Sequence, residues 1–170
     1  SQYGIEWCRR IVGAMSQAPE KPVIVSGLAI GVDICAHLAA LECGLPTIAV
    51  MATGIDSVYP YRHRADAGRI ASTEGCALVT DYPPGTPPLQ INFLRRNRII
   101  AGLSNATILI ESRIRGGGMM TANLAFSYGR GVYALPGRVD DPRSQGCNRL
   151  IHARVAEPIT DIAGLGKDLG

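Results

Sequence analysis

The segment "ATILIESRIRGGGMMTANLA" (Ala106–Ala125) decides the fold prediction. It opens with an apolar run typical of a buried strand and closes with a stretch typical of a helix. Two arginines and three consecutive glycines lie between them, where the strand would hand over to the helix. Such a loop suits an anion, because bare backbone N–H groups at a helix N-terminus can point at an oxyanion while arginine adds charge.

The rest of the chain repeats this alternation of apolar strands and helices. The strands are continuously apolar, which favours a parallel sheet buried on both faces. We therefore predict an α/β fold: a doubly wound, mostly parallel Rossmann-like sheet with helices on both faces. Because such a chain normally begins with a strand and this one begins with a helix, we expect its first strand to be missing from these residues. The predicted strands are 22–27, 46–54, 76–84, 106–112, 131–137 and a short final one; the helices are 5–15, 31–44, 63–72, 92–104, 119–130 and one beginning at 146.

Composition limits the class of protein. The chain has 170 residues, 46% hydrophobic and 18% charged, which predicts one domain spanning 1–170 with its own core. A net charge of +3 permits a polyanionic partner without requiring one. None of the five cysteines has zinc-ligand spacing, so we expect reduced cysteines, no metal site and a cytoplasmic location. The apolar runs are too short to cross a membrane, so no membrane partner is expected.

Several motifs carry a specific resemblance. In order and spacing, "VSGLAIGVDICAH", "GIDSVYP", "YPPGTPP", "NFLRRNRIIAGLS", "GGGMMTANLA" and "LPGRVDDPRSQGCNRLI" resemble the DprA/Smf family of DNA-processing proteins. The resemblance implies a cytosolic protein of natural transformation that binds single-stranded DNA without sequence preference and loads a RecA-type recombinase. It also implies a homodimer with an extended Rossmann fold. The N-terminal helical domain and C-terminal winged-helix-like domain of many members are not expected in these 170 residues.

The sequence departs from the family pattern in two loops. The family usually reads Ser-Gly-Leu-Ala-Arg-Gly in the first glycine loop, and here Ile30 replaces that arginine. In the second loop the family usually has Lys-Ser-Gly-Ser, whereas this chain has Arg115 followed by Gly116, Gly117 and Gly118. The positive charge is kept there, and two hydroxyl donors are lost.

The candidate DNA- and phosphate-binding residues come from these loops and from the basic helix. Each has a plainer interpretation: tight strand–helix turns need glycine anyway, basic runs are usually solvated helix surface, and methionines after a glycine turn usually pack in the core. From Asn97 and Arg98 we expect at least one side chain at the phosphate. The candidates are Ser26, Gly27, Gly31, Asn97, Arg98, Arg115, Gly116, Gly117, Gly118, Met119 and Thr121.

The competing class is an enzyme or simple nucleotide binder of related fold, such as a nucleoside-monophosphate phosphoribohydrolase. That signature places a Thr directly after its glycines and a Glu soon after. Here Thr121 comes two residues late and no acid follows until Asp140. Because cleavage of the glycosidic bond needs a carboxylate, we expect no enzyme activity, no catalytic residue and no cofactor.

Overall fold

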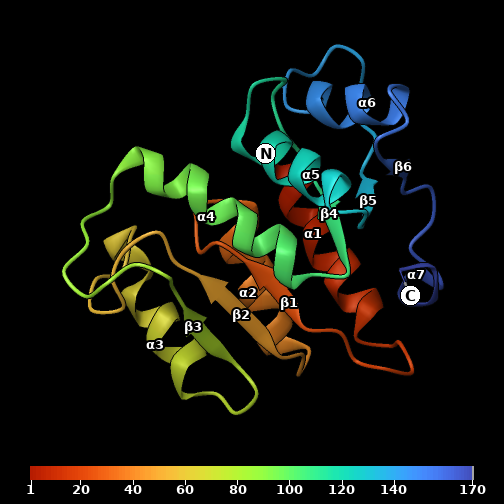
Figure 1. Ribbon diagram of the computed structural model, residues 1–170. Coiled ribbons are helices and arrows are strands. Elements are labelled where there is room, and N and C mark those ends of the chain that lie inside the picture. Colours follow the sequence, from red (N-terminus) through yellow and green to blue (C-terminus); the bar gives the residue numbers. More distant parts are fainter. Residues whose placement is uncertain (170) are drawn as a thin grey trace.

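The computed structural model describes residues 1–169 of the chain (Figure 1). Its helices are α1 (Gln2–Met15), α2 (Val32–Glu42), α3 (Arg64–Ser72), α4 (Gln90–Leu103), α5 (Gly117–Ser127), α6 (Gln145–His152) and α7 (Leu165–Asp168), with a 3₁₀ turn η1 (Tyr61–His63). Its strands are β1 (Ile24–Ser26), β2 (Thr47–Val50), β3 (Ala77–Val79), β4 (Ala106–Leu109), β5 (Gly131–Ala134) and β6 (Glu157–Pro158).

All strand pairs are parallel, which confirms the predicted α/β class. The strands form two sheets of three, in the orders β1-β2-β3 and β4-β5-β6. Among the described residues β1 and β4 do not pair with each other, so the single continuous sheet that the alternation suggests is divided.

The strands are shorter than the apolar runs, and the reason is local. Beyond β2 and β3 the backbone leaves the regular ladder, and threonine hydroxyl groups donate to some of its carbonyls. Thr80 Oγ1 donates to the carbonyl of Thr53 at 2.7 Å, and Thr53 Oγ1 donates to the carbonyl of Ser57. These contacts tie together the loops that follow the two strands, at the carboxyl end of the sheet.

The short helix α7 was not predicted, because only four residues form it and its one buried side chain is Leu165.

Three apolar clusters hold the elements together. One packs the buried face of α1, including Cys8 and Ile11, against α2 and residues of the second sheet. Another joins α5, α6 and the second sheet, and the third lies under α3. Helix α4 contacts β1, β2 and α5 and so bridges the two halves, as Figure 1 shows.

The cysteines behave as small apolar side chains. All five are free, and Cys8, Cys35 and Cys147 are buried. Burial raises the pKa of the Cys147 thiol to about 12 and also raises the pKa of Cys8. Both groups therefore stay protonated near neutral pH.

Within residues 1–169, no helix has both the length and the apolar character needed to cross a bilayer. The same part of the chain brings together no group of three or more His, Cys, Asp or Glu residues suited to a metal ion.

Candidate nucleic-acid interface

Two glycine turns follow the first strand of each sheet. The first glycine turn, residues 27–31, leads from β1 into α2, and the second glycine turn, residues 112–118, leads from β4 into α5. Both therefore lie at the carboxyl ends of parallel strands, where α/β sheets bind ligands.

The second glycine turn combines free backbone donors with free positive charge. The amides of Gly117 and Gly118, the first residues of α5, donate to no acceptor in the described part of the chain. Arg113 and Arg115 are exposed and form no ion pair within residues 1–169. Unsatisfied N–H groups at a helix N-terminus together with arginines suit a phosphate oxygen.

The three glycines of this turn have different roles. A Cβ on Gly116 would overlap Ser112 Oγ, and one on Gly118 would lie 2.6 Å from Leu109 Cδ1. At Gly117 a Cβ would meet nothing within 4 Å. A side chain at Gly116 or Gly118 would therefore make Ser112 or Leu109 shift, and of the three glycines only Gly117 presents bare backbone to open space.

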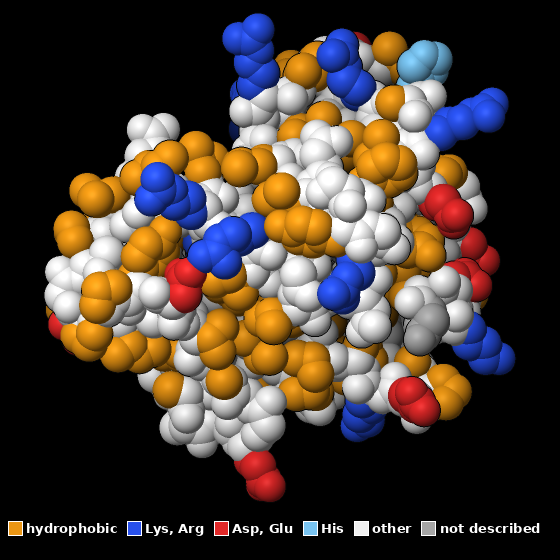
Figure 2. Space-filling model, in the orientation of Figure 1, with side chains coloured by type: hydrophobic (Ala, Val, Ile, Leu, Met, Phe, Trp, Pro, Cys, Tyr) orange, Lys and Arg blue, Asp and Glu red, His pale blue; other side chains and the backbone are white. Residues whose placement is uncertain are grey.

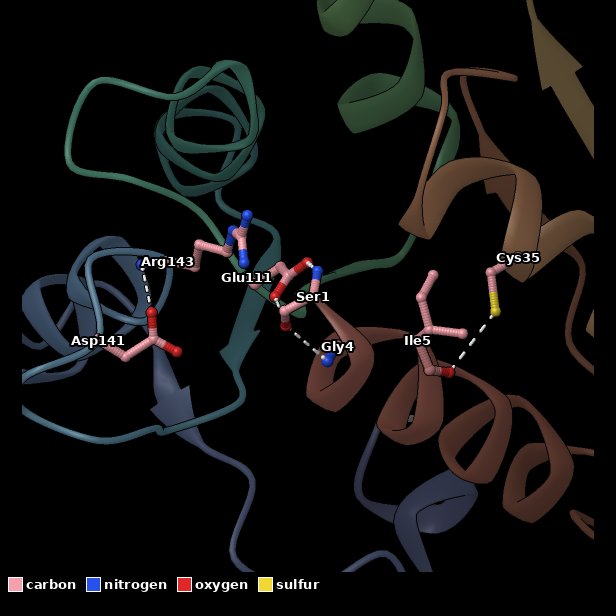
Figure 3. Close-up of polar contacts among 7 residues, drawn as sticks. All are labelled: Ser1, Gly4, Ile5, Cys35, Glu111, Asp141 and Arg143. Atoms are coloured by element: carbon pink, nitrogen blue, oxygen red, sulfur yellow. Dashed lines mark hydrogen bonds and ion pairs between the residues drawn. The ribbon is translucent and has the colours of Figure 1, made fainter.

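The second glycine turn is also fixed from the side of α6. The amide of Ser112 donates to the carbonyl of Arg143 at 2.8 Å, and the amide of Gly146 donates to the carbonyl of Ser112 at 2.9 Å. Figure 3 shows Glu111 between this loop and the start of α1, where its carboxylate accepts from the Ser1 Oγ hydroxyl at 2.5 Å. These contacts bring the exposed Arg143 to the same turn as Arg113, a contribution that the sequence did not reveal because thirty positions separate the two.

In the first glycine turn, buried side chains bond to part of the backbone, so only some of its polar groups are free. The amide of Gly27 donates to Asp33 Oδ2 at 3.1 Å, and its carbonyl accepts from Arg96 Nη1 at 2.8 Å. Gly27 is buried, so its backbone has no donor left for a phosphate and its predicted direct contact needs correction. Gly31, at φ +97°, precedes α2 in a conformation that suits glycine, and its amide has no acceptor among the described residues. Ser26 is half-buried as the last residue of β1.

The basic run on α4 divides between core and surface. Arg96 and Asn97 are buried, with 5% and 8% of their surfaces exposed, and Arg96 Nε donates to Asn97 Oδ1 at 3.3 Å. Arg95 is exposed, and Arg98 is exposed but paired with Asp81. Of the two predicted residues, Asn97 is therefore taken into the interior and Arg98 is engaged by a carboxylate. The sequence pattern did not single out Arg96, although the buried positions 92, 96, 97 and 101 do follow helical spacing.

The structure buries the methionine that was predicted to contact DNA and exposes its neighbour. Met119, the predicted contact, packs in the cluster with α6 and is 9% exposed, whereas Met120 is 40% exposed. The helical period turns the first side chain toward the core and the second outward. Met120 is thus the methionine that a ligand could reach. Thr121 is half-buried on the next turn of α5.

Two buried histidines serve the scaffold. His63 Nδ1 lies 2.7 Å from the carbonyl of Leu28, and His37 Nδ1 lies 2.7 Å from Thr47 Oγ1. Thr47 Oγ1 itself donates to the carbonyl of Ile24, so it accepts from His37 and fixes the proton on Nδ1.

Known proteins resemble this chain over most of its length. Residues 1–170 match the family described as DNA recombination-mediator protein A. Protein Smf from Escherichia coli (strain K12) is 42% identical over 151 residues, which are 89% of this chain and 40% of that protein. DNA processing protein DprA from Streptococcus pneumoniae is 44% identical over 129 residues, which are 76% of this chain and 45% of that protein. This chain thus spans less than half the length of either relative.

Two solved structures share the fold. DNA processing protein A from Streptococcus pneumoniae superposes with a TM-score of 0.88 at 37% identity, covering 99% of this chain and 56% of that one. The protein from Helicobacter pylori, whose structure concerns its single-stranded DNA binding mode, also gives a TM-score of 0.88, at 29% identity and with 99% and 74% covered. Since the family match extends over every residue, the chain belongs to the DNA recombination-mediator protein A family, which includes the DprA and Smf proteins.

Proposed function

We propose that this chain binds the phosphate backbone of single-stranded DNA, mainly at the second glycine turn. The observation that carries the proposal is the juxtaposition of the free amides of Gly117 and Gly118 with the unpaired, exposed Arg113 and Arg115. The likeness to the Helicobacter pylori protein, which binds single-stranded DNA, supports it.

The binding should be largely independent of sequence. Backbone amides and arginines engage phosphate oxygens, which all nucleotides share, and neither turn has an array of side-chain amides that would read base edges. The free amides of the first glycine turn extend the phosphate path, with Ile30 in place of a cation at its tip. A strand that interacts by its phosphates alone leaves its bases free to pair.

Within this proposal the protein is a recombination mediator rather than an enzyme. It acts in the cytoplasm as a homodimer, holds incoming single strands and loads a RecA-type recombinase on them. Membership of the recombination-mediator family supports this role. The region 1–170 is the Rossmann-like core that supplies the DNA surface.

The deciding experiment is an oligothymidine titration at several lengths and salt concentrations. Binding should strengthen with length, and log K should fall against log salt with a slope of roughly −2 to −5, as expected for a few phosphate contacts. A slope near zero, or tighter binding to duplex than to oligothymidine, would contradict the proposal. Tighter binding to a mononucleotide, or release of free base from nucleoside monophosphates, would favour the nucleotide-binding or phosphoribohydrolase alternative.

A further inference from the structure

Three side chains from three separate elements hold the backbone of the first glycine turn. Asp33 of α2 accepts from the amide of Gly27 at 3.1 Å. Arg96 of α4 donates to the carbonyl of Gly27 at 2.8 Å, and His63 of η1 bonds to the carbonyl of Leu28 at 2.7 Å. The amide and carbonyl of Gly27 and the carbonyl of Leu28 are thus fixed from beneath.

Arg96 is the central member of this group. Its Nη1 donates at once to the carbonyl of Gly27 and, at 2.7 Å, to the carbonyl of Val50. One guanidinium therefore joins the ends of β1 and β2 to α4. The side chain is 5% exposed and forms no ion pair in the described part of the chain. Burial lowers the pKa of Arg96 and the nearby Asp33 carboxylate opposes that shift, so the two carbonyls and Asp33 together hold the buried charge.

The shape of the turn matches this group closely. A Cβ on Gly27 would lie 2.7 Å from Arg96 Cζ and 2.8 Å from Asp33 Oδ2, so only glycine fits between them. Leu28 has φ +65°, an unusual conformation for a leucine, and is buried. Such a residue keeps this conformation only where its surroundings over-determine it.

The other side of the same turn, residues 30–32, has free backbone donors. The amides of Ile30, Gly31 and Val32 donate to no acceptor among residues 1–169, and the Ile30 side chain is 66% exposed. At the inner half of the turn the amide and carbonyl of Gly27 and the carbonyl of Leu28 are bonded, whereas the outer amides are free. A rigid, preorganised donor set binds an anion better than a mobile one, because less entropy is lost on binding.

We propose that Arg96 is a positioning residue: it does not touch DNA but holds the first glycine turn in the conformation that presents the Ile30–Val32 amides to a phosphate. This deepens the proposed function and rests on it for the identity of the ligand. It also gives the arginines of α4 different roles. Arg96 shapes the turn from the interior of the protein, whereas Arg95 and Arg98 lie on the surface.

The test compares Arg96→Met with Arg95→Met, which removes the same charge from an exposed position on the same helix. Each variant is examined by ¹⁵N–¹H resonances of residues 28–32, by oligothymidine affinity and by thermal unfolding. In Arg96→Met we expect the turn resonances to shift and the affinity to fall about tenfold at temperatures where the protein is folded. In Arg95→Met the turn resonances should stay in place and the affinity should change less than threefold, as for a lost surface charge. Arg96→Lys, which keeps the charge without the planar fork, should lie between them.

The proposal requires that Arg96→Met both shifts the turn resonances and lowers the affinity for oligothymidine. It is overturned if Arg96→Met binds like Arg95→Met, or if it loses affinity while the turn resonances stay in place. Should Arg96→Met fail to fold, the same comparisons between Arg96→Lys and Arg95→Met decide. Should the unaltered protein not bind oligothymidine, the proposed function fails, and the resonances alone then decide whether Arg96 shapes the turn.

Discussion

Arg98 on α4 forms an ion pair with Asp81, in the loop that follows β3. Both side chains are about half exposed, at 52% and 41%, so the pair is screened by solvent and holds the arginine only weakly. On the face of the molecule shown in Figure 2, basic side chains lie among hydrophobic ones. Asp81 thus competes with any phosphate for Arg98.

Asp81→Asn should therefore strengthen DNA binding. The substitution removes a repelling charge and frees Arg98, so the salt dependence of binding should steepen by about one unit. Glu74→Gln, at an exposed acid before the amino end of β3, is the matched control and should have little effect. An Asp81→Asn protein with unchanged affinity and slope would remove Arg98 from the DNA path.

Arg115→Ala should weaken oligonucleotide binding by tenfold or more. A hydrogen bond from a charged donor contributes about 1.5–3 kcal/mol, and Arg115 has no competing carboxylate in the described chain. Arg69→Ala removes the same charge from an exposed position on α3 and should have a much smaller effect. Equal losses for the two variants would mean that binding depends on net charge alone.

Ile30→Arg should tighten binding at no cost in stability. The side chain is 66% exposed, so the substitution removes almost no packing and places a cation next to the free amides of the first glycine turn. One added phosphate contact should steepen the salt slope by about one unit. Affinity and melting temperature are measured on the same variant. Unchanged affinity in a protein of unchanged stability would exclude the first glycine turn from the phosphate path.

The sequence predicted the parts of this site that depend on local pattern. Apolar runs followed by glycine located both turns, because strand and helix periods are readable over short windows. Which residue of a basic run is buried depends on what the helix packs against, so Arg96 could not be distinguished from Arg95 by composition. In the same way, the sequence does not show that Gly116 and Gly118 also lie close to Ser112 and Leu109, because those contacts depend on how the turn packs.

Substitutions at adjacent glycines should separate packing from ligand binding. Gly116→Ala forces a methyl group onto Ser112 Oγ and should destabilise the fold by about 1–3 kcal/mol. Gly117→Ala meets no neighbour within 4 Å and replaces glycine at the start of a helix, so stability should be kept or rise by up to about 1 kcal/mol. Urea unfolding measures both. If DNA approaches the bare backbone at Gly117, the stable Gly117→Ala protein should nevertheless bind oligothymidine more weakly; full affinity there would place the phosphate elsewhere.

The stability of the fold should depend on pH through His37. Its ring is fully buried, and among the described residues Nε2 has no hydrogen-bond partner. Burial lowers the pKa of His37 to about 4, with Asp33 opposing the shift while Arg96 and His63 add to it. An unfolded histidine takes up a proton near its ordinary pKa of 6.5, whereas the folded one stays neutral until about pH 4. The stability that neutral His37 gives the fold is therefore fully present above pH 6.5. It is lost as the pH falls toward 4, at up to about 1.4 kcal/mol per pH unit from this one group.

Urea unfolding of the unaltered protein and of His37→Gln at pH 7.5 and pH 5 measures this loss, because the other titrating groups are common to both proteins. The unaltered protein should lose more stability between the two pH values than His37→Gln does, and equal losses would show that His37 is not the group responsible.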